Sequence, residues 1–178
     1  MKWLNSLFGG RRHISALGTG TRAPQFELPA MDGSKFSLKD ALSRGPVLAV
    51  FFKISCPVCQ YALPYFERIY KAHGLKKVSI VGISQNDKND TAQFMKKYAV
   101  TFPVLLDDTS TFAASNAYGL TNVPTAFWIA EDGNIEISSV GWVRQEFEEM
   151  ARNAASVVGD KPHPVFQPTE NIADFRAG

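Results

Sequence analysis

Two apolar runs stand out in the hydrophobic pattern of the chain, residues 47–52 and 78–83. Both have the length of a β-strand, and the first is apolar at every position, as expected for a strand covered on both faces. Apolar residues at helical spacing follow the first run from Pro57 to near Gly74, and we expect Pro64 to kink this helix. The pattern therefore predicts buried strands that alternate with helices.

Shorter segments complete the predicted α/β order. Alternating Phe26 and Leu28, a turn at residues 31–34, and alternating Phe36 and Leu38 predict an N-terminal β-hairpin. A second hairpin is predicted near the end of the sheet, where Asp-Gly separates two apolar segments. In chain order, the other predictions are a short helical turn at 37–40, a helix after the polar loop 85–90, a strand at 103–106, a helix at 109–118, strands at 125–130 and 135–140, and a closing helix at 145–158.

The order of these elements predicts a mixed central sheet with helices on both faces. A chain of 178 residues with 45% hydrophobic content can bury one core but is short for two domains with tails. We expect an N-terminal arm at 1–17, one domain at 18–160 and an extended C-terminal tail at 161–178. The tail cannot form one helix because it contains Pro162, Pro164 and Pro168. We expect three apolar residues to hold it to the domain, namely Val165, Phe166 and Phe175.

Charge and hydropathy narrow the possible partners. Nineteen Lys and Arg against 17 Asp and Glu leave a net charge of +2, and no basic stripe interleaved with aromatics predicts a nucleic-acid surface. The first eight residues do not form a convincing signal peptide, and no apolar run reaches the roughly 18 residues of a membrane span. We expect a cytoplasmic monomer. Association with a membrane surface through residues 1–12 is the alternative, although so short a segment buries little area.

The only two cysteines lie in Cys56-Pro57-Val58-Cys59, at the corner between the first strand and its helix. At such a corner Cys56 takes the N-cap position, where unpaired amides and the helix dipole favour a thiolate. Cys59 lies one turn further along, shielded but close enough to attack a mixed disulfide on Cys56. We therefore predict redox chemistry with Cys56 as the nucleophile and Cys59 as the resolving thiol.

Two other uses of a cysteine pair are less consistent with this sequence. Structural zinc sites usually need four protein ligands, and the histidines, His13, His73 and His163, are scattered singly. A structural disulfide across a four-residue loop removes little entropy from the unfolded chain and would stabilise weakly. We expect neither a metal nor an organic cofactor.

Four segments together resemble thioredoxin-fold proteins of the redoxin branch, which includes TlpA/ResA-like thiol-disulfide oxidoreductases and peroxiredoxins. They are the leader at 20–28 with the hairpin that follows, the active-site strand and helix at 51–64, the segment at 98–107, and Val123-Pro124-Thr125. The resemblance implies a thioredoxin-like three-layer sandwich. It also implies a cis peptide bond before Pro124, with Val123 and Pro124 in contact with an extended substrate. The implied partners are a protein dithiol or disulfide and an upstream reductase or oxidant.

The chain departs from the resembling families at two acidic positions. Thioredoxins carry an acid six residues before the first cysteine, and TlpA/ResA-like proteins often carry a glutamate three residues after the second. Val50 and Ala62 occupy these places here. Lys53, just before the site, is expected to be a solvated residue at the end of the strand. Because both acids are missing, a redox-sensing or binding module without enzymatic activity stays an alternative.

Peroxide reduction, an antioxidant activity, is the other enzymatic alternative. Peroxiredoxins normally place a threonine three residues and a proline seven residues before the peroxidatic cysteine. For Cys56 these places hold Lys53 and Ala49, and for Cys59 they hold Cys56 and Phe52. Since neither alignment supplies the peroxide pocket, we expect thiol-disulfide exchange instead, although exposed thiolates still react slowly with peroxide.

Overall fold

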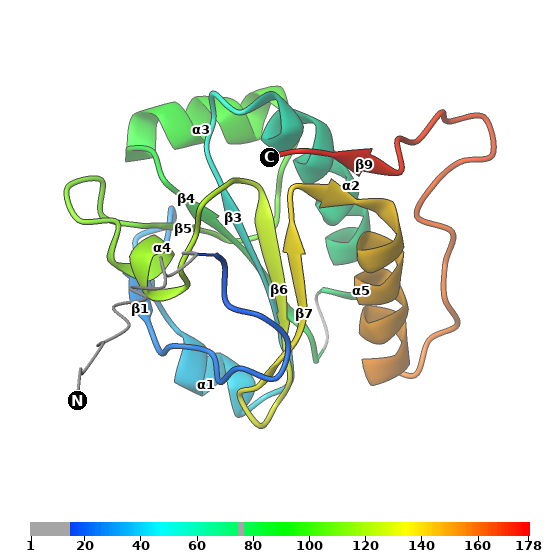
Figure 1. Ribbon diagram of the computed structural model, residues 1–178, viewed down its shortest axis with the longest axis horizontal. Helices are drawn as coiled ribbons and strands as arrows, with labels where there is room; N and C mark the ends of the chain where they lie inside the picture. The colour runs from blue at the N-terminus through cyan, green and yellow to red at the C-terminus, as the bar shows by residue number, and fades with distance from the viewer. Residues whose placement is uncertain (1–14, 75–76) are drawn as a thin grey trace, which may run out of the picture.

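The computed structural model describes residues 15–74 and 77–178, and its centre is a mixed five-stranded sheet (Figure 1). The strand order is β5-β4-β3-β6-β7. β3 pairs in parallel with β4 and antiparallel with β6, while β4 and β5 are parallel and β6 and β7 antiparallel. The bounds are β3 Val47–Phe52, β4 Ser79–Ser84, β5 Val104–Leu106, β6 Thr125–Ile129 and β7 Ile135–Val140.

Strand β3 is the middle of the molecule, and all six of its residues are buried. Successive side chains of a strand point to opposite faces. Leu48, Val50 and Phe52 therefore enter one hydrophobic cluster, while their neighbours in β3 enter the other. This two-faced burial confirms the prediction made from the uninterrupted apolar run.

Helices cover both faces of the sheet (Figure 1). Helices α2, α3 and α5 contribute to the cluster on one face. Helices α1 and α4 and the hairpin of β1 and β2 contribute to the cluster on the other. The three-layer α/β sandwich and the N-terminal hairpin are thus confirmed. The bounds are β1 Glu27–Pro29, β2 Lys35–Ser37, α1 Leu38–Leu42, α2 Pro57–His73, α3 Lys88–Lys97, α4 Ala113–Ala117 and α5 Arg144–Val157.

Helix α2 begins and ends where local chemistry favours it. Cys56 is the N-cap in an extended conformation, and Pro57 is the first helical residue, where its missing N–H costs nothing. Gly74 follows the last turn and donates its N–H to the Tyr70 carbonyl (2.8 Å). Pro64 lies inside the helix. The buried face of α2 packs on the sheet, so its first turn is held at the carboxyl end of β3.

A buried carboxylate fastens the middle of α2 to the segment before β5. Glu67, 4% exposed, accepts hydrogen bonds from the backbone N–H groups of Thr101 (2.7 Å) and Phe102 (3.2 Å) and from the Thr101 hydroxyl. Carboxylates that accept backbone N–H groups make strong hydrogen bonds. Glu67 therefore couples two elements that the sequence keeps far apart.

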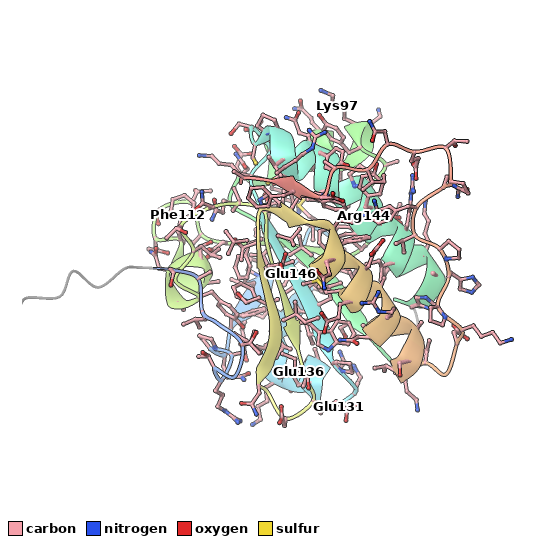
Figure 2. All side chains as sticks on the ribbon, turned by 45° about the vertical axis from the view of Figure 1, so that its right-hand side comes forward. Lys97, Phe112, Glu131, Glu136, Arg144 and Glu146 are labelled. Carbon is pink, nitrogen blue, oxygen red and sulfur yellow. The ribbon has the colours of Figure 1, made fainter. Side chains whose placement is uncertain are left out.

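The helix predicted at residues 109–118 is shorter than expected, because α4 spans only Ala113–Ala117. Phe112, labelled in Figure 2, has φ +48°, a left-handed conformation that cannot continue a right-handed helix. Before it, the N–H of Phe112 closes a turn onto the Asp108 carbonyl (2.7 Å). The buried Asp107 carboxylate then accepts the N–H groups of Ala114 and Ser115 and so fixes the helix start.

The C-terminal tail is more ordered than the sequence predicts. Phe175–Arg176 form strand β9, which pairs antiparallel with β8, Trp142–Val143. Val165 and Phe166 pack against the core as expected, but the Phe175 ring is 62% exposed. The buried apolar residue near the end of the tail is Ile172 instead. Phe175 thus holds the tail through its backbone and not through its side chain.

Among the described residues, no helix is long and apolar enough to cross a membrane. Most of the predicted N-terminal arm lies outside these residues, as does the whole segment 1–12 considered for membrane contact.

Candidate active site

The Cys56 sulfur lies at the amino end of α2, between the first helical turn and a loop from another part of the chain. The Cys59 backbone N–H donates to Cys56 Sγ (3.3 Å), as expected for an N-cap side chain. The Cys56 thiol donates to the Val123 carbonyl oxygen (3.1 Å). Cys56 is partly exposed, and both cysteines are free thiols in this structure. An accessible sulfur at the amino end of a helix is open to attack on a partner disulfide.

Val123 and Pro124 lie next to this sulfur. The peptide bond between them is cis, the geometry expected at this place. Pro124 is buried, Val123 is partly exposed, and the Pro124 carbonyl accepts the Gly141 N–H (2.7 Å). Thr125 Oγ1 donates to the Asn122 carbonyl (2.7 Å). The structure thus brings Cys56 and Val123 together, although 67 positions separate them in the sequence.

Cys59 differs from Cys56 in its surroundings. It is 0% exposed and belongs to the hydrophobic cluster on the α2 side of the sheet. Burial raises the pKa of the Cys59 thiol far above its ordinary value, since an apolar environment disfavours the charged form. Cys59 is therefore a protonated thiol at neutral pH.

Two polar residues brace the turn that precedes Cys56. The Gln60 side chain donates to the Ile54 carbonyl (2.9 Å), and the Ile54 N–H donates to the Asn86 side chain (3.0 Å). The backbone C=O of Ile54 is thus held by a side chain from α2, and its N–H by a side chain from the loop after β4. Neither Gln60 nor Asn86 is predicted as a site residue from the sequence pattern. The only local signal for Gln60 is its place one turn after the N-cap. No local signal marks Asn86.

The two positions that lack an acid are filled by core residues. Val50 and Ala62 are both fully buried in the same cluster as Cys59. The environment of Cys59 is therefore apolar at the places where related sequences carry a carboxylate. Lys53 is exposed, as expected for a solvated residue at the end of the strand.

The two histidines that the structure describes do not converge on the cysteine pair. His73 is the last residue of α2, at the opposite end from Cys56, and its ring lies 5.8 Å from that of His163. His13 lies outside the described residues. Across residues 15–74 and 77–178, no three His, Cys, Asp or Glu side chains are grouped to hold a metal ion.

Comparisons with known proteins agree with this geometry. Residues 19–138 match the AhpC/TSA family. The thiol-disulfide oxidoreductase ResA of Bacillus subtilis (strain 168) is 33% identical over 132 residues, which cover 74% of this chain and 70% of that protein. ResA of Halalkalibacterium halodurans is 29% identical over 132 residues, or 73% of each. A solved structure, a putative thiol:disulfide interchange protein DsbE from Chlorobium tepidum, has a TM-score of 0.70 at 23% identity and is similar over 81% of this chain and 100% of that one.

Proposed function

The chain belongs to the AhpC/TSA family, and on that premise we propose that it is a thiol-disulfide oxidoreductase that acts on a protein partner through Cys56 and Cys59. The observation that carries this proposal is the contrast between the two sulfur atoms. Cys56 is accessible at the helix end, and Cys59 is buried and protonated one turn away. This arrangement separates a thiol that attacks from a thiol that resolves.

In the reducing direction, the Cys56 thiolate attacks one sulfur of a partner disulfide. A bond forms between Cys56 Sγ and that sulfur, the partner S–S bond breaks, and the other partner sulfur leaves as a thiolate that takes a proton from solvent. The Val123 carbonyl and Pro124 border the approach to Cys56 Sγ. We assign them to contact with an extended segment of the partner.

In the second step, Cys59 loses its proton and attacks Cys56 Sγ. The Cys56–Cys59 disulfide forms, the mixed disulfide breaks, and the partner leaves with its second thiol. Two electrons have then passed from the dithiol to the partner, and an upstream reductase must return them. The same steps in reverse oxidise a partner dithiol and require an upstream oxidant. Measuring the reduction potential of the pair decides between the two directions.

The surroundings of Cys56 favour this chemistry over peroxide reduction. The peroxide pocket of peroxiredoxins has a threonine and a proline at the places of Lys53 and Ala49. Lys53 is exposed, and Ala49 is buried in the cluster on the other face of the sheet. Neither residue supplies a hydroxyl group to a peroxide bound at Cys56.

Serine variants of the two cysteines test the proposal. Cys59→Ser keeps the nucleophile and removes the resolving thiol, so it should accumulate a mixed disulfide with insulin whose disulfides are intact. Cys56→Ser should form no adduct and should reduce insulin no faster than a buffer control. Mass spectrometry of non-reduced samples detects the adduct, and insulin turbidity reports the rate.

Two results would contradict the proposal in different ways. An adduct on the Cys56→Ser protein and none on Cys59→Ser would reverse the roles of the two thiols. No adduct on either variant, together with no insulin reduction by the unmodified protein, would favour a redox-sensing or binding module. Circular dichroism of each variant serves as the folding control.

A further inference from the structure

The end of the chain returns to the active site. Residues 172–178, which we call the C-terminal strap, run from the outer side of α2 to the loop that carries Val123 (Figure 1). β9 lies within the strap and pairs with β8, at the position where Trp142 faces Arg176. The strap therefore adds a short strand along the edge that leads to Cys56.

The last residue of the strap lies against the carbonyl that Cys56 contacts. A side-chain Cβ built on Gly178 would lie 2.6 Å from the Val123 oxygen and 3.2 Å from Gly141 Cα. The Asn122 side chain donates to the Gly178 carbonyl (2.9 Å). Since the Val123 oxygen also accepts the Cys56 thiol, the strap ends one residue away from the nucleophile.

The base of the strap is anchored firmly. Ile172 is buried in the core cluster. Trp142 Nε1 donates to the Ala173 carbonyl (2.6 Å), and the Ala173 N–H donates to the Tyr61 hydroxyl (3.2 Å). Just before the strap, Glu170 makes two hydrogen bonds to Arg68 (2.6 and 2.8 Å). Core packing and side-chain hydrogen bonds therefore hold this part of the tail.

The end of the strap is held more lightly. Residues 174–178 are all exposed, so they bury little apolar surface. Besides the hydrogen bond from Asn122 to the Gly178 carbonyl, their contacts are the two-residue β pairing, the hydrogen bond from the Arg144 N–H to the Asp174 carbonyl (2.9 Å), the exposed Arg144–Asp174 ion pair (3.8 Å), and the Arg176 guanidinium 3.9 Å from the centre of the Tyr61 ring. Figure 2 shows Arg144 at the start of α5, close to this part of the tail. Such exposed contacts are individually worth little.

We propose that the C-terminal strap is an autoinhibitory segment that occupies the docking edge for an extended peptide of the protein substrate. The inference rests on the proposed thiol-disulfide exchange and adds a regulatory contact to it. A partner peptide that pairs with β8 and reaches Val123 must first displace residues 174–178, because both cannot pair with the same edge. The strap contains no cysteine, so it blocks the edge without reacting.

Competition of this kind lowers the apparent affinity for substrate in proportion to the open fraction. A strap that is closed most of the time reduces kcat/KM for a protein disulfide by about three- to tenfold relative to an open one. Small reagents that reach the Cys56 sulfur without pairing along β8 are not affected. Comparing a protein substrate with a small reagent therefore distinguishes opening of the strap from a change in the reactivity of the Cys56 thiol.

Arg176→Ala tests the strap in the chain of 178 residues, because it removes the contact with the Tyr61 ring. Lys161→Ala is the matched control, since it removes the same charge from an exposed part of the tail outside the strap. We expect insulin reduction and labelling of Cys56 by a polyethylene-glycol maleimide to rise about two- to fourfold in Arg176→Ala only, because one exposed contact is lost and the strap opens in part. Labelling by iodoacetamide should be the same in all three proteins.

Arg176→Pro is the second variant, because it removes the backbone N–H from the residue that pairs with Trp142. NMR signals of residues 174–178 show whether the strap is released. Release without faster maleimide labelling in either variant would overturn the proposal. So would a strap that stays docked in both variants while the labelling rate rises. Faster maleimide labelling with no insulin reduction by any variant would support the strap and count against the oxidoreductase.

Discussion

At the scale of single residues, the two cysteines are distinguished by what surrounds each sulfur. Helix-end amides and an exposed loop flank Cys56, and the apolar core encloses Cys59. Three positions apart on one helix, they lie on the same side of α2 but at different depths. The depths differ because Cys56 caps the helix end, whereas Cys59 lies one turn inside the helix and belongs to the core cluster.

Alkylation of the native dithiol should report this difference. Iodoacetamide should modify Cys56 and leave Cys59 unmodified, because burial raises the pKa of the Cys59 thiol and only thiolates react quickly. Peptide mapping by mass spectrometry measures both sites. The same reaction in denaturant, where both thiols are exposed, is the control. Equal labelling of the two cysteines in the folded protein would contradict the assignment.

At the scale of elements, two carboxylates connect segments that are far apart in the sequence. Glu67 holds α2 to the segment before β5, and Glu170 holds the tail to α2 through Arg68. Both act on α2, the helix that carries the cysteine pair. The position of the active site thus depends on side chains far from the sulfur atoms.

Glu67→Gln should lower the free energy of unfolding by about 1–3 kcal/mol, because a buried charge-assisted acceptor of backbone N–H groups is lost. Urea denaturation followed by circular dichroism measures the change. Glu148→Gln is the control, since Glu148 pairs with Arg144 on the surface (3.2 Å) and such pairs contribute less than about 1 kcal/mol. Equal losses in the two variants would remove the special role of Glu67.

The hydrogen-bonded ion pair between Arg68 and Glu170, which we call the clip, should break in acid. Hydrogen bonding to the Arg68 guanidinium lowers the pKa of Glu170 from 4.5 to about 2. Because the folded-state pKa is below the ordinary one, the clip stabilises the docked tail fully above about pH 4.5 and is lost as the pH falls toward about 2. NMR signals of residues 165–178, compared with those of β3, measure the release.

Glu170→Gln provides the control for this titration. Its tail should be looser than that of the unmodified protein at neutral pH and should show no further release between about pH 4.5 and 2. A tail in the unmodified protein that stays docked below about pH 2, while β3 stays folded, would contradict the clip. An identical acid response in Glu170→Gln would assign the release to another group.

At the scale of the whole molecule, the chain packs a two-faced sheet around β3 and then returns its C-terminus to the carboxyl end of that strand (Figure 1). The parts of the site come from the start of α2, the loop before β6 and the corner before β8. One end of the sheet therefore carries the nucleophile, the proposed peptide edge and the strap.

Features that depend on neighbouring residues could be predicted from the sequence alone. The apolar run of β3, the spacing of α2 and the Asp-Gly turn before β7 were all predicted, because burial period and turn chemistry act within a few positions. The N-cap placement of Cys56 was predicted for the same reason, since Pro57 fixes the helix start. Two nearby thiols in unequal environments followed from these local rules.

Only the tertiary structure decided which distant residues meet these elements. Phe112 delays the start of a predicted helix because Asp107 and Asp108 bind the turn around it, and the sequence pattern gives no weight to such contacts. Asn86, Glu67 and the strap reach their partners across 32, 34 and up to 112 positions. Hydrogen bonds of this kind form only after the layers have packed, because packing alone brings their donors and acceptors within reach.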